Sequence, residues 1–310
     1  MSEGWGKENI LKRRISRRKA VGTAAKVAGS AVAGLVIGGV AGYVLKPEAP
    51  PVEKIQTVTE ARTVTATVKP KGKFTEPPPA GAEVVIIHGF DAAYPPFTEV
   101  TPTGEAKGFD VDVVKWIANK YGWKVVPKPW DWATIVTALV EGDIDIIASG
   151  MTHTAARAEK VWYSIPYYVY YHHLLALKDE TRTMEEILNS GEYISCQLGA
   201  TSDEWAEKLL KEGYKFKKLA LDSYALAFEA VLDKRAVAVI SDSAFTQPYF
   251  KEKPEIAARF REVGRLGGIS TYAIATRPED YWLRNMINHA LRELMDSPIW
   301  NELLDKWGLA

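Results

Sequence analysis

Short apolar runs that alternate with helical patterns from residue 84 onward constrain the fold most strongly. The run 84–87 is continuously apolar, which is typical of a strand covered on both faces. Residues 109–121 carry apolar side chains at helical spacing, and Gly122 ends that pattern. The alternation repeats along the chain. It predicts an α/β fold with mainly parallel sheets.

The same patterns place the further elements of the body. Strands are expected at 124–126, 144–149, 193–197 and 237–241, and helices at 134–140, 201–211, 226–232, 281–295 and 299–307. A capping box over Thr201–Glu204 is expected to begin one of these helices. Asp242 is expected to cap the N-terminus of the next helical turn.

Residues 1–45 have the character of an export signal or a membrane anchor. Basic side chains cluster between Lys7 and Lys19, ahead of an uncharged stretch at 27–45. As a helix, that stretch would span roughly 28 Å, about the hydrocarbon thickness of a bilayer. The pair Arg17 and Arg18 resembles the twin-arginine export signal, and the basic excess places the body on the extracytoplasmic face. Cleavage of the segment is left open, as is a helix-pairing role for its glycines.

Residues 46–82 are expected to form a stalk, because prolines at both ends favour an extended, semi-rigid spacer. The folded body is expected at 83–310. Cys196 is the only cysteine, so an intramolecular disulfide is excluded, and so is a lipoprotein anchor beside the apolar segment. The 39 basic and 39 acidic side chains balance, so composition indicates no attraction to nucleic acid.

Four positions in the body follow directly after expected strands. They are Asp91, the segment 150–157, the segment 199–201 and Asp242. Open α/β sheets usually bind ligands at the carboxyl ends of their strands. Two of these positions fall in the first half of the body and two in the second, so we expect two α/β lobes that face each other across a cleft.

The chemistry at these positions complements a zwitterion. Arg157 offers a planar fork for a carboxylate, and Thr152 offers a hydroxyl donor. The backbone N–H groups of Ala200 and Thr201, at an expected helix N-terminus, would reinforce this anion site. Asp242 suits an ammonium group. The capping roles of Asp242 and Thr201 remain the plain alternative.

Two aromatic side chains, Tyr94 and Trp132, are candidates for walls around a ligand side chain. The alternative is that both belong to the core. Among the histidines, we expect His153 to point away from the cleft, and His172 and His173 to face opposite sides of one strand. None of the five histidines has the spacing of a metal site.

Seven short motifs occur in the order known from a family of binding proteins. They are Tyr94–Phe97, Gly108–Asp112, Gly142–Asp145, Gly150–Thr154 with Arg157, Ser164–Tyr168, Gln197–Thr201 and Lys306–Gly308. Over residues 83–310 the chain resembles the family 3 class of extracellular solute-binding proteins, the polar amino-acid-binding proteins of ABC importers. The resemblance implies a two-lobed periplasmic-binding-protein-like fold (type II), with two crossing strands near 170–177 and 268–275.

The resemblance also implies domain limits and residue roles. Lobe 1 would hold about 83–175 and 270–310, and lobe 2 about 176–269. By the matching motifs, the carboxylate would be held by Arg157, Thr152 and Thr201, the ammonium by Gly150 and Asp242, and the side chain would meet Asp91, Tyr94, Trp132 and Gln197. Ala155, Ala156, Ala200 and Val237 depart from the usual pattern, and Ala200 removes one hydroxyl contact.

The resulting hypothesis is a binding protein and not an enzyme. It would bind a free amino acid, polar or basic, at the extracytoplasmic face and deliver it to an ABC transporter permease. No cofactor, metal or nucleic acid is implied. Two alternatives stay open: an enzyme of the cyclohexadienyl or arogenate dehydratase type on the same fold, and a membrane-anchored amino-acid sensor.

Overall fold

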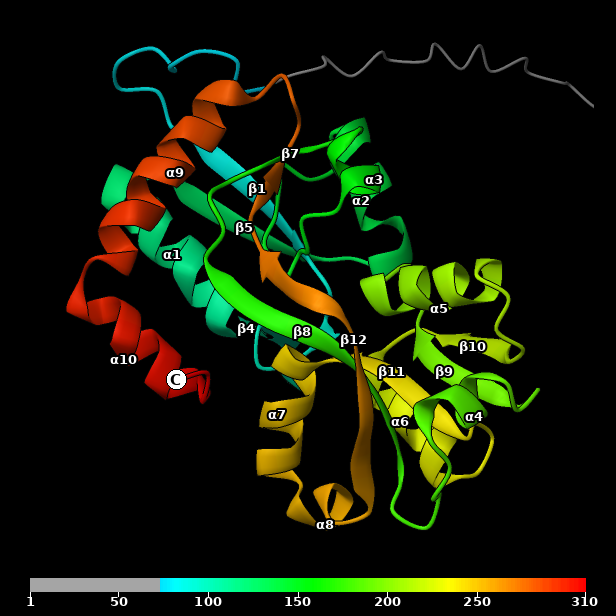
Figure 1. Ribbon diagram of the computed structural model, residues 1–310. Helices are drawn as coiled ribbons and strands as arrows, with labels where there is room; N and C mark the ends of the chain where they lie inside the picture. The colour runs from blue at the N-terminus through cyan, green and yellow to red at the C-terminus, as the bar shows by residue number, and fades with distance from the viewer. Residues whose placement is uncertain (1–72) are drawn as a thin grey trace, which may run out of the picture. The chain divides into compact units, whose positions relative to one another are not determined.

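The computed structural model describes residues 73–310, and these belong to one compact unit, 64–310. The predicted export signal or anchor, and the predicted stalk as far as residue 72, lie outside the described residues. The described part contains two five-stranded sheets and a small three-stranded sheet (Figure 1). Both large sheets mix parallel and antiparallel pairs, with helices packed around them.

The first large sheet combines strands from distant parts of the chain. Its strand order is β5 (Lys124–Pro129), β1 (Val85–Phe90), β6 (Ile146–Ile147), β13 (Ala275–Thr276) and β7 (Trp162–Tyr163). The three strands β5, β1 and β6 run parallel, whereas β13 is antiparallel to both of its neighbours. A small antiparallel sheet of β2 (Ala93–Tyr94), β3 (Thr98–Val100) and β4 (Ala106–Lys107) follows β1.

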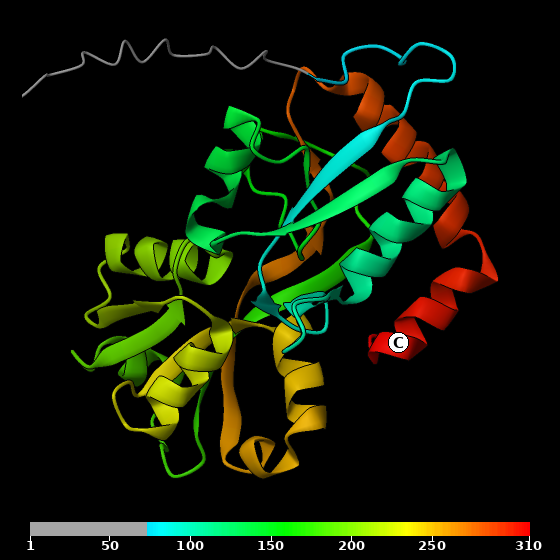
Figure 2. The ribbon, with the colours of Figure 1, turned by 180° about the vertical axis from the view of Figure 1, so that it is seen from behind.

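Helices of the first lobe come from both ends of the described chain. They are α1 (Phe109–Tyr121), the 3-10 helix η1 (Trp132–Thr134), α2 (Ile135–Glu141), α3 (Ala155–Ala158), α9 (Tyr281–Met295) and α10 (Pro298–Trp307). Figure 2 shows α1 and the C-terminal α9 and α10 gathered on one side of β1 and β5. We call this sheet with its helices lobe 1.

The second large sheet is continuous in sequence. Its order is β10 (Lys217–Leu221), β9 (Tyr193–Gln197), β11 (Ala238–Asp242), β8 (Tyr168–Leu177) and β12 (Phe260–Tyr272). It is covered by α4 (Met184–Leu188), α5 (Thr201–Lys211), α6 (Tyr224–Leu232), α7 (Ser243–Glu252) and α8 (Pro254–Ala257). We call this group lobe 2.

Strands β8 and β12 connect the lobes. They pair antiparallel from Leu177 opposite Phe260 to Tyr168 opposite Tyr272. The chain leaves β7 of lobe 1 to enter β8, and it leaves β12 to enter β13 of lobe 1. Figure 1 shows the two long strands running from the first sheet into the second. The two predicted crossing segments are therefore parts of β8 and β12, with the last one ending at β13.

The first described residues are fastened to lobe 1. The Lys73 ammonium bonds the Asp145 carboxylate at 2.9 Å, and the Phe74 backbone N–H donates to Asp280 at 2.7 Å. Phe74 is buried and stacks against Trp282 with 6.3 Å between ring centroids. These contacts lie where β1 and β6 begin, at the opposite end of the sheet from the site described below.

Most expected elements are confirmed, and the exceptions have local causes. The strand expected at 144–149 is shortened to Ile146–Ile147. The Ile144 carbonyl accepts from the Arg277 guanidinium at 2.6 Å, and the Ser149 hydroxyl accepts from the Asp91 backbone N–H. Side chains thus bond both ends of this segment, and only residues 146–147 in its middle are paired as a strand of the sheet.

The two predicted caps are wrong in their chemistry. Ala200, not Thr201, is the N-cap of α5, and no side chain caps that helix. The Thr201 hydroxyl instead lies 2.7 Å from His172. Asp242 does occupy the N-cap position of α7, but its carboxylate makes no capping bond there. Both side chains are directed to partners in the lobe interface, which local sequence does not reveal.

Within residues 73–310 no helix is both long and apolar enough to cross a bilayer.

Candidate functional site

A small buried cavity lies where the carboxyl ends of β1, β6, β9 and β11 meet. It is lined by Asp91, Tyr94, Trp132, Ser149, Gly150, Thr152, Gln197, Ala200, Thr201, Tyr224 and Asp242. Nine of the ten predicted ligand-binding residues are in this set; the exception is Arg157. The space open to the centre of a water molecule is about 10 Å³, which is room for about one water. The lobes are therefore closed upon the site.

The wall from lobe 1 is built on the ends of β1 and β6. Asp91 follows β1, and its own carboxylate accepts from the Ala93 backbone N–H at 2.9 Å. Burial raises the pKa of the Asp91 carboxyl. Gly150 follows β6 with φ of +55°, and a side chain there would overlap the Tyr94 ring. Only glycine fits both this backbone conformation and this close contact.

The wall from lobe 2 is built on β9, α5 and β11. Gln197 is the last residue of β9, and its amide donates to the Asp91 carboxylate at 2.7 Å. This bond joins the two lobes directly. Thr201 opens α5, whose N-terminus brings unpaired backbone N–H groups and the positive end of the helix dipole to the cavity.

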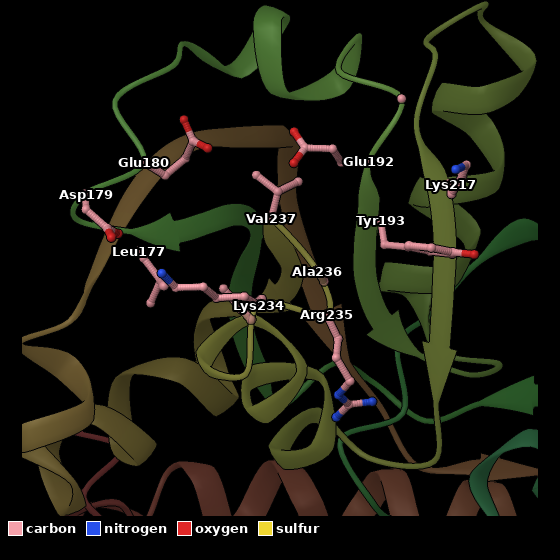
Figure 3. A pocket seen from close by; sticks show the side chains of 12 residues that line it. Leu177, Asp179, Glu180, Glu192, Tyr193, Lys217, Lys234, Arg235, Ala236 and Val237 are labelled. Carbon is pink, nitrogen blue, oxygen red and sulfur yellow. The ribbon is translucent and has the colours of Figure 1, made fainter.

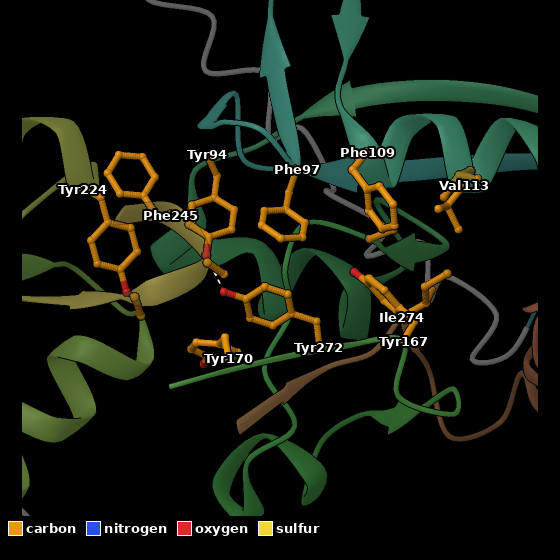
Figure 4. Packing of buried hydrophobic residues seen from close by; sticks show 14 of the residues in the cluster. Tyr94, Phe97, Phe109, Val113, Tyr167, Tyr170, Tyr224, Phe245, Tyr272 and Ile274 are labelled. Atoms are coloured by element: carbon orange, nitrogen blue, oxygen red, sulfur yellow. Dashed lines mark hydrogen bonds between the residues drawn. The ribbon is translucent and has the colours of Figure 1, made fainter. Parts of the chain in front are cut away.

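Asp242, the last residue of β11, carries the buried charge of lobe 2. Its Oδ2 accepts from the hydroxyls of Tyr94 and Tyr272, each at 3.2 Å. Those two hydroxyls also bond each other (Figure 4, dashed line). Burial, helped by the charge of Asp242, raises the pKa of both tyrosines, so they stay protonated as donors.

Three polar atoms around the cavity have no hydrogen-bond partner in the described part of the chain. They are Oδ1 of Asp242, which His172 Nε2 approaches to 3.3 Å without a hydrogen bond, the hydroxyl of Tyr224 and the indole N–H of Trp132. Buried polar groups in folded proteins are almost always paired, since an unpaired one costs free energy. Their concentration at one small cavity indicates a place where a polar ligand supplies the missing partners.

Aromatic rings give the cavity a rigid floor. Tyr94 stacks on Phe97 and Phe245, and Tyr224 stacks on Phe245 with ring centroids 5.2 Å apart. Figure 4 shows these rings in a row that continues to Phe109 in lobe 1. Tyr94 is thus both cavity wall and core residue, so the two readings of this residue are compatible.

No group of three or more His, Cys, Asp and Glu side chains in residues 73–310 is arranged to hold a metal ion. The lining residues offer hydrogen bonds, two carboxylates and aromatic faces. These groups suit the recognition of an organic molecule with a cationic group.

The family profile described as bacterial extracellular solute-binding proteins, family 3, matches residues 86–310. This chain belongs to that family. The match covers both lobes and every residue that lines the cavity.

Known proteins agree with this membership. The arginine-binding extracellular protein ArtP of Bacillus subtilis is 29% identical over 229 residues, covering 72% of this chain and 85% of ArtP. The solved structure of an ancestral arginine-binding protein bound to arginine is 34% identical with a TM-score of 0.65, covering 72% of this chain and 97% of that one. The cyclohexadienyl dehydratase of Pseudomonas aeruginosa is 27% identical over 168 residues, covering 53% of this chain and 62% of the dehydratase.

Arg157 of this family 3 protein is buried but is not among the residues that line the cavity. It sits in α3, is buried, and donates from Nη2 to the Gly199 carbonyl at 3.0 Å and from Nη1 to the Thr152 carbonyl at 3.2 Å. Its guanidinium centre is 5.4 Å from the Trp132 ring. The bond to Gly199 reaches across from lobe 1 to lobe 2. Carboxylate binding by Arg157 stays a prediction, because its guanidinium bonds two backbone carbonyls and is not among the lining side chains.

The histidine predictions are consistent with the structure. His153 is exposed and packs edge-on against Tyr163, and it does not line the small cavity. His172 contacts Thr201, whereas His173 bonds Glu262 and Thr246 on the other face of β8.

The sequence reasoning missed two lining residues, Ser149 and Tyr224. Ser149 directly precedes the predicted Gly150 motif. Tyr224 follows the end of β10, so the rule that ligands gather at strand ends could have found it. It was missed because β10, at 217–221, was not among the expected strands.

Proposed function

We propose that this family 3 solute-binding protein binds a free amino acid in the cavity between its lobes and delivers it to the permease of an ABC importer. The observation that carries the proposal is the buried Oδ1 of Asp242, which accepts no hydrogen bond and has His172 Nε2 at 3.3 Å beside it. A buried carboxylate oxygen without a partner is costly unless a cation pairs with it. The α-ammonium of an amino acid is a compact cation that fits this place.

The α-carboxylate then has a site within reach of the same cavity. Thr152 and Thr201 line it with hydroxyls from opposite lobes, and the N-terminus of α5 favours negative charge there. Arg157, held between Thr152 and Gly199, supplies the fork that completes the carboxylate site.

The side-chain end of the ligand would face Asp91, Trp132 and Tyr94. A carboxylate beside two aromatic faces favours a cationic side chain, through charge pairing and cation–π contact. The two arginine-binding relatives support the same choice. We therefore propose a basic amino acid, with L-arginine as the first ligand to test.

Binding would require an open form, because the closed cavity has room for about one water. Opening separates Gln197 from Asp91, Arg157 from Gly199 and Tyr94 from Asp242, three bonds between the lobes described above. A ligand that contacts both walls favours closure about the β8–β12 hinge. The permease would then recognise the closed surface.

A thermal-shift panel of the twenty amino acids tests the proposal. We expect L-arginine to raise the melting temperature by about 5–10 °C at roughly a hundredfold excess over its Kd. Arg157→Ala should lose this stabilisation, whereas Arg265→Ala should keep it, because Arg265 lies in β12, bonds Glu262 and does not line the cavity. A parent protein stabilised by no amino acid would contradict the function, and stabilisation by acidic or aliphatic ligands alone would contradict the ligand class.

The similarity to a cyclohexadienyl dehydratase keeps one enzymatic candidate in view. Such an enzyme would expel water from a ring-bearing substrate held in the same cavity. Incubation of the protein with arogenate or prephenate, followed by detection of the aromatic product, separates the two functions. We expect no product above the uncatalysed background.

We further propose that the chain works outside the cytoplasm and that residues 1–45 export or anchor it. The family's extracellular character supports the first part, and the basic cluster ahead of residues 27–45 supports the second. Fractionation of cells that express the full chain tests this. A membrane-bound sensor without a permease partner would be indicated if amino-acid uptake does not depend on the protein.

A further inference from the structure

One titratable side chain of the hinge, His172, lies near both the proposed carboxylate site and the proposed ammonium site. His172 lies on β8, is 2% exposed, and its Nε2 is 2.7 Å from the Thr201 hydroxyl. The same nitrogen is 3.3 Å from Oδ1 of Asp242. It therefore contacts the proposed carboxylate site and the proposed ammonium site at once.

Tyr170, two residues earlier on the same face of β8, extends this contact to lobe 1. Its hydroxyl is 3.2 Å from His172 Nε2 and 2.7 Å from the Thr152 hydroxyl. The hinge strand thus links Thr152 of lobe 1 with Thr201 and Asp242 of lobe 2. A change in the charge of His172 would be felt by all of these groups.

We propose that His172 is a positioning residue that makes amino-acid binding compete with a proton: neutral His172 orients Thr201 and leaves Asp242 to the ligand, and protonated His172 pairs with Asp242 and weakens binding. This inference rests on the proposed function and adds a regulation of the same site. Acidification then favours release of the amino acid.

The hydrogen-bond chemistry gives the neutral form its role. When Nε2 carries the only ring proton, it donates to the Thr201 oxygen, and the Thr201 hydroxyl proton is free to donate to a ligand carboxylate. Oδ1 of Asp242 then faces an uncharged ring and accepts no hydrogen bond, so it is left for the ammonium.

The protonated form competes through Asp242. Protonation adds its proton at Nδ1, and the ring then carries a positive charge 3.3 Å from Oδ1, which offsets the carboxylate charge that the ammonium needs. The direct effects of the imidazolium on the ligand are opposed, because it repels the ammonium and attracts the carboxylate. The net effect therefore depends on Asp242: once its charge is paired with the imidazolium, the ligand ammonium is held less tightly, and affinity falls as the pH falls.

Burial lowers the pKa of His172, and the charge of Asp242 opposes this shift. Its titration therefore falls on the acidic side of the ordinary histidine range. The charged or titratable groups around it are Asp242 from β11, Tyr170 and His173 from β8, Arg157 from α3, Glu204 and Lys208 from α5, and His153 from the preceding loop. From β12 the paired residue is the apolar Leu266.

Two other buried groups near the cavity titrate with shifted pKa values. Burial raises the pKa of Asp110, which bonds the Gly150 backbone, to about 7, and it also raises that of Asp91. Their effect on binding is the same in the parent and in a His172 variant. The test therefore compares how the Kd of the parent and that of the variant change with pH.

The experiment measures the Kd of L-arginine by calorimetry at pH 7.5 and pH 5.0, with the full chain and with His172→Gln and His173→Gln. Glutamine can still donate to Thr201 but does not titrate. We expect the Kd of the parent to rise about tenfold more between the two pH values than that of His172→Gln. His173→Gln, on the other face of β8, should behave as the parent does.

The outcomes separate the inference from the function. A parent that binds no amino acid at pH 7.5 would refute the proposed function. A parent that binds, with equal pH ratios for the parent and His172→Gln, would overturn the role of His172 alone. If His172→Gln fails to fold, His172→Asn takes its place in the same comparison: we again expect a smaller rise in Kd than in the parent, and equal pH ratios overturn the proposal.

Discussion

Two hollows at opposite ends of the lobe 2 sheet differ in size, charge pairing and solvent contact. The large one lies where β9 and β10 begin, and offers about 460 Å³ to the centre of a water molecule (Figure 3). The small one lies where β9 and β11 end, and offers about 10 Å³. Size alone would select the large hollow as the binding site.

The pairing of polar groups selects the small one. Around the large hollow, Arg182 bonds Glu180 at 2.5 Å and Glu192 at 2.6 Å, and Lys217 lies over the Tyr193 ring. None of its lining residues has a buried polar atom without a partner among those described. The small cavity has three such atoms. Unpaired, desolvated polar groups mark a ligand site better than open volume does.

The strongest way to break this comparison is Asp242→Asn. The amide keeps the size of the side chain but removes the charge that pairs with the ammonium. We expect the Kd of L-arginine to rise at least about a hundredfold, since truncation of a buried charge pair costs about 2–5 kcal/mol. Asp179→Asn, in the large hollow, should leave the Kd unchanged. Equal binding by both variants in calorimetry would place the ligand elsewhere.

A second test compares two glycines with positive φ. Gly150 has φ of +55° and no room beside Tyr94, whereas Gly191 in the large hollow has φ of +74° and open space. Both alanine variants carry backbone strain of about 1–2 kcal/mol. Only Gly150→Ala adds a clash with a cavity wall. We expect it to weaken L-arginine binding by about tenfold and to melt several degrees lower than Gly191→Ala in calorimetric scans; identical melting would show that Tyr94 moves aside freely.

A third test sharpens the comparison at a hydroxyl. Tyr224→Phe removes one unpaired buried donor and preserves the ring that stacks on Phe245. A hydrogen bond is worth about 0.5–1.5 kcal/mol, so we expect a threefold to tenfold weaker Kd. Tyr193→Phe in the large hollow should bind as the parent does. If Tyr224→Phe binds L-arginine normally while gaining stability, its hydroxyl does not meet the ligand.

The smallest expected effect concerns stability and pH. Burial raises the pKa of Asp110 to about 7, and its Oδ1 has no partner among the described residues. A carboxyl whose folded pKa is raised stabilises the fold below its unfolded pKa near 4, and this stability is lost as the pH rises through about 7. The melting temperature of Asp110→Asn relative to the parent should therefore rise by on the order of 5 °C between pH 5 and pH 8. A difference that stays constant with pH would mean that Asp110 is ionised throughout.

Local sequence patterns predicted much of the fold. The strand at 193–197 and the helices at 201–211 and 281–295 match their bounds. Periodicity and glycine stops are local properties, so they can be read from the chain directly. The failures involve residues whose partners are distant: β6 is short because Arg277, far along the chain, bonds the Ile144 carbonyl.

The sequence predicted which residues line the site better than it predicted which of them bond one another. The strand-end rule and the family motifs named nine lining residues. They did not show that the Thr201 hydroxyl bonds His172, or that Arg157 bonds the Gly199 carbonyl in the closed form. Both contacts join segments about thirty or more residues apart. The Arg157 contact forms when the hinge strands bring the lobes together, and the His172 contact forms where β8 meets α5 within lobe 2, so no local pattern encodes either.

The central claim is that the small cavity, and not the large hollow, holds a free amino acid. A crystal structure of the protein grown with L-arginine tests it most directly. We expect the amino acid between the lobes, with its ammonium on Oδ1 of Asp242 and its carboxylate at the start of α5. Density for the ligand in the large hollow, or a cavity filled only by water at saturating L-arginine, would contradict the account.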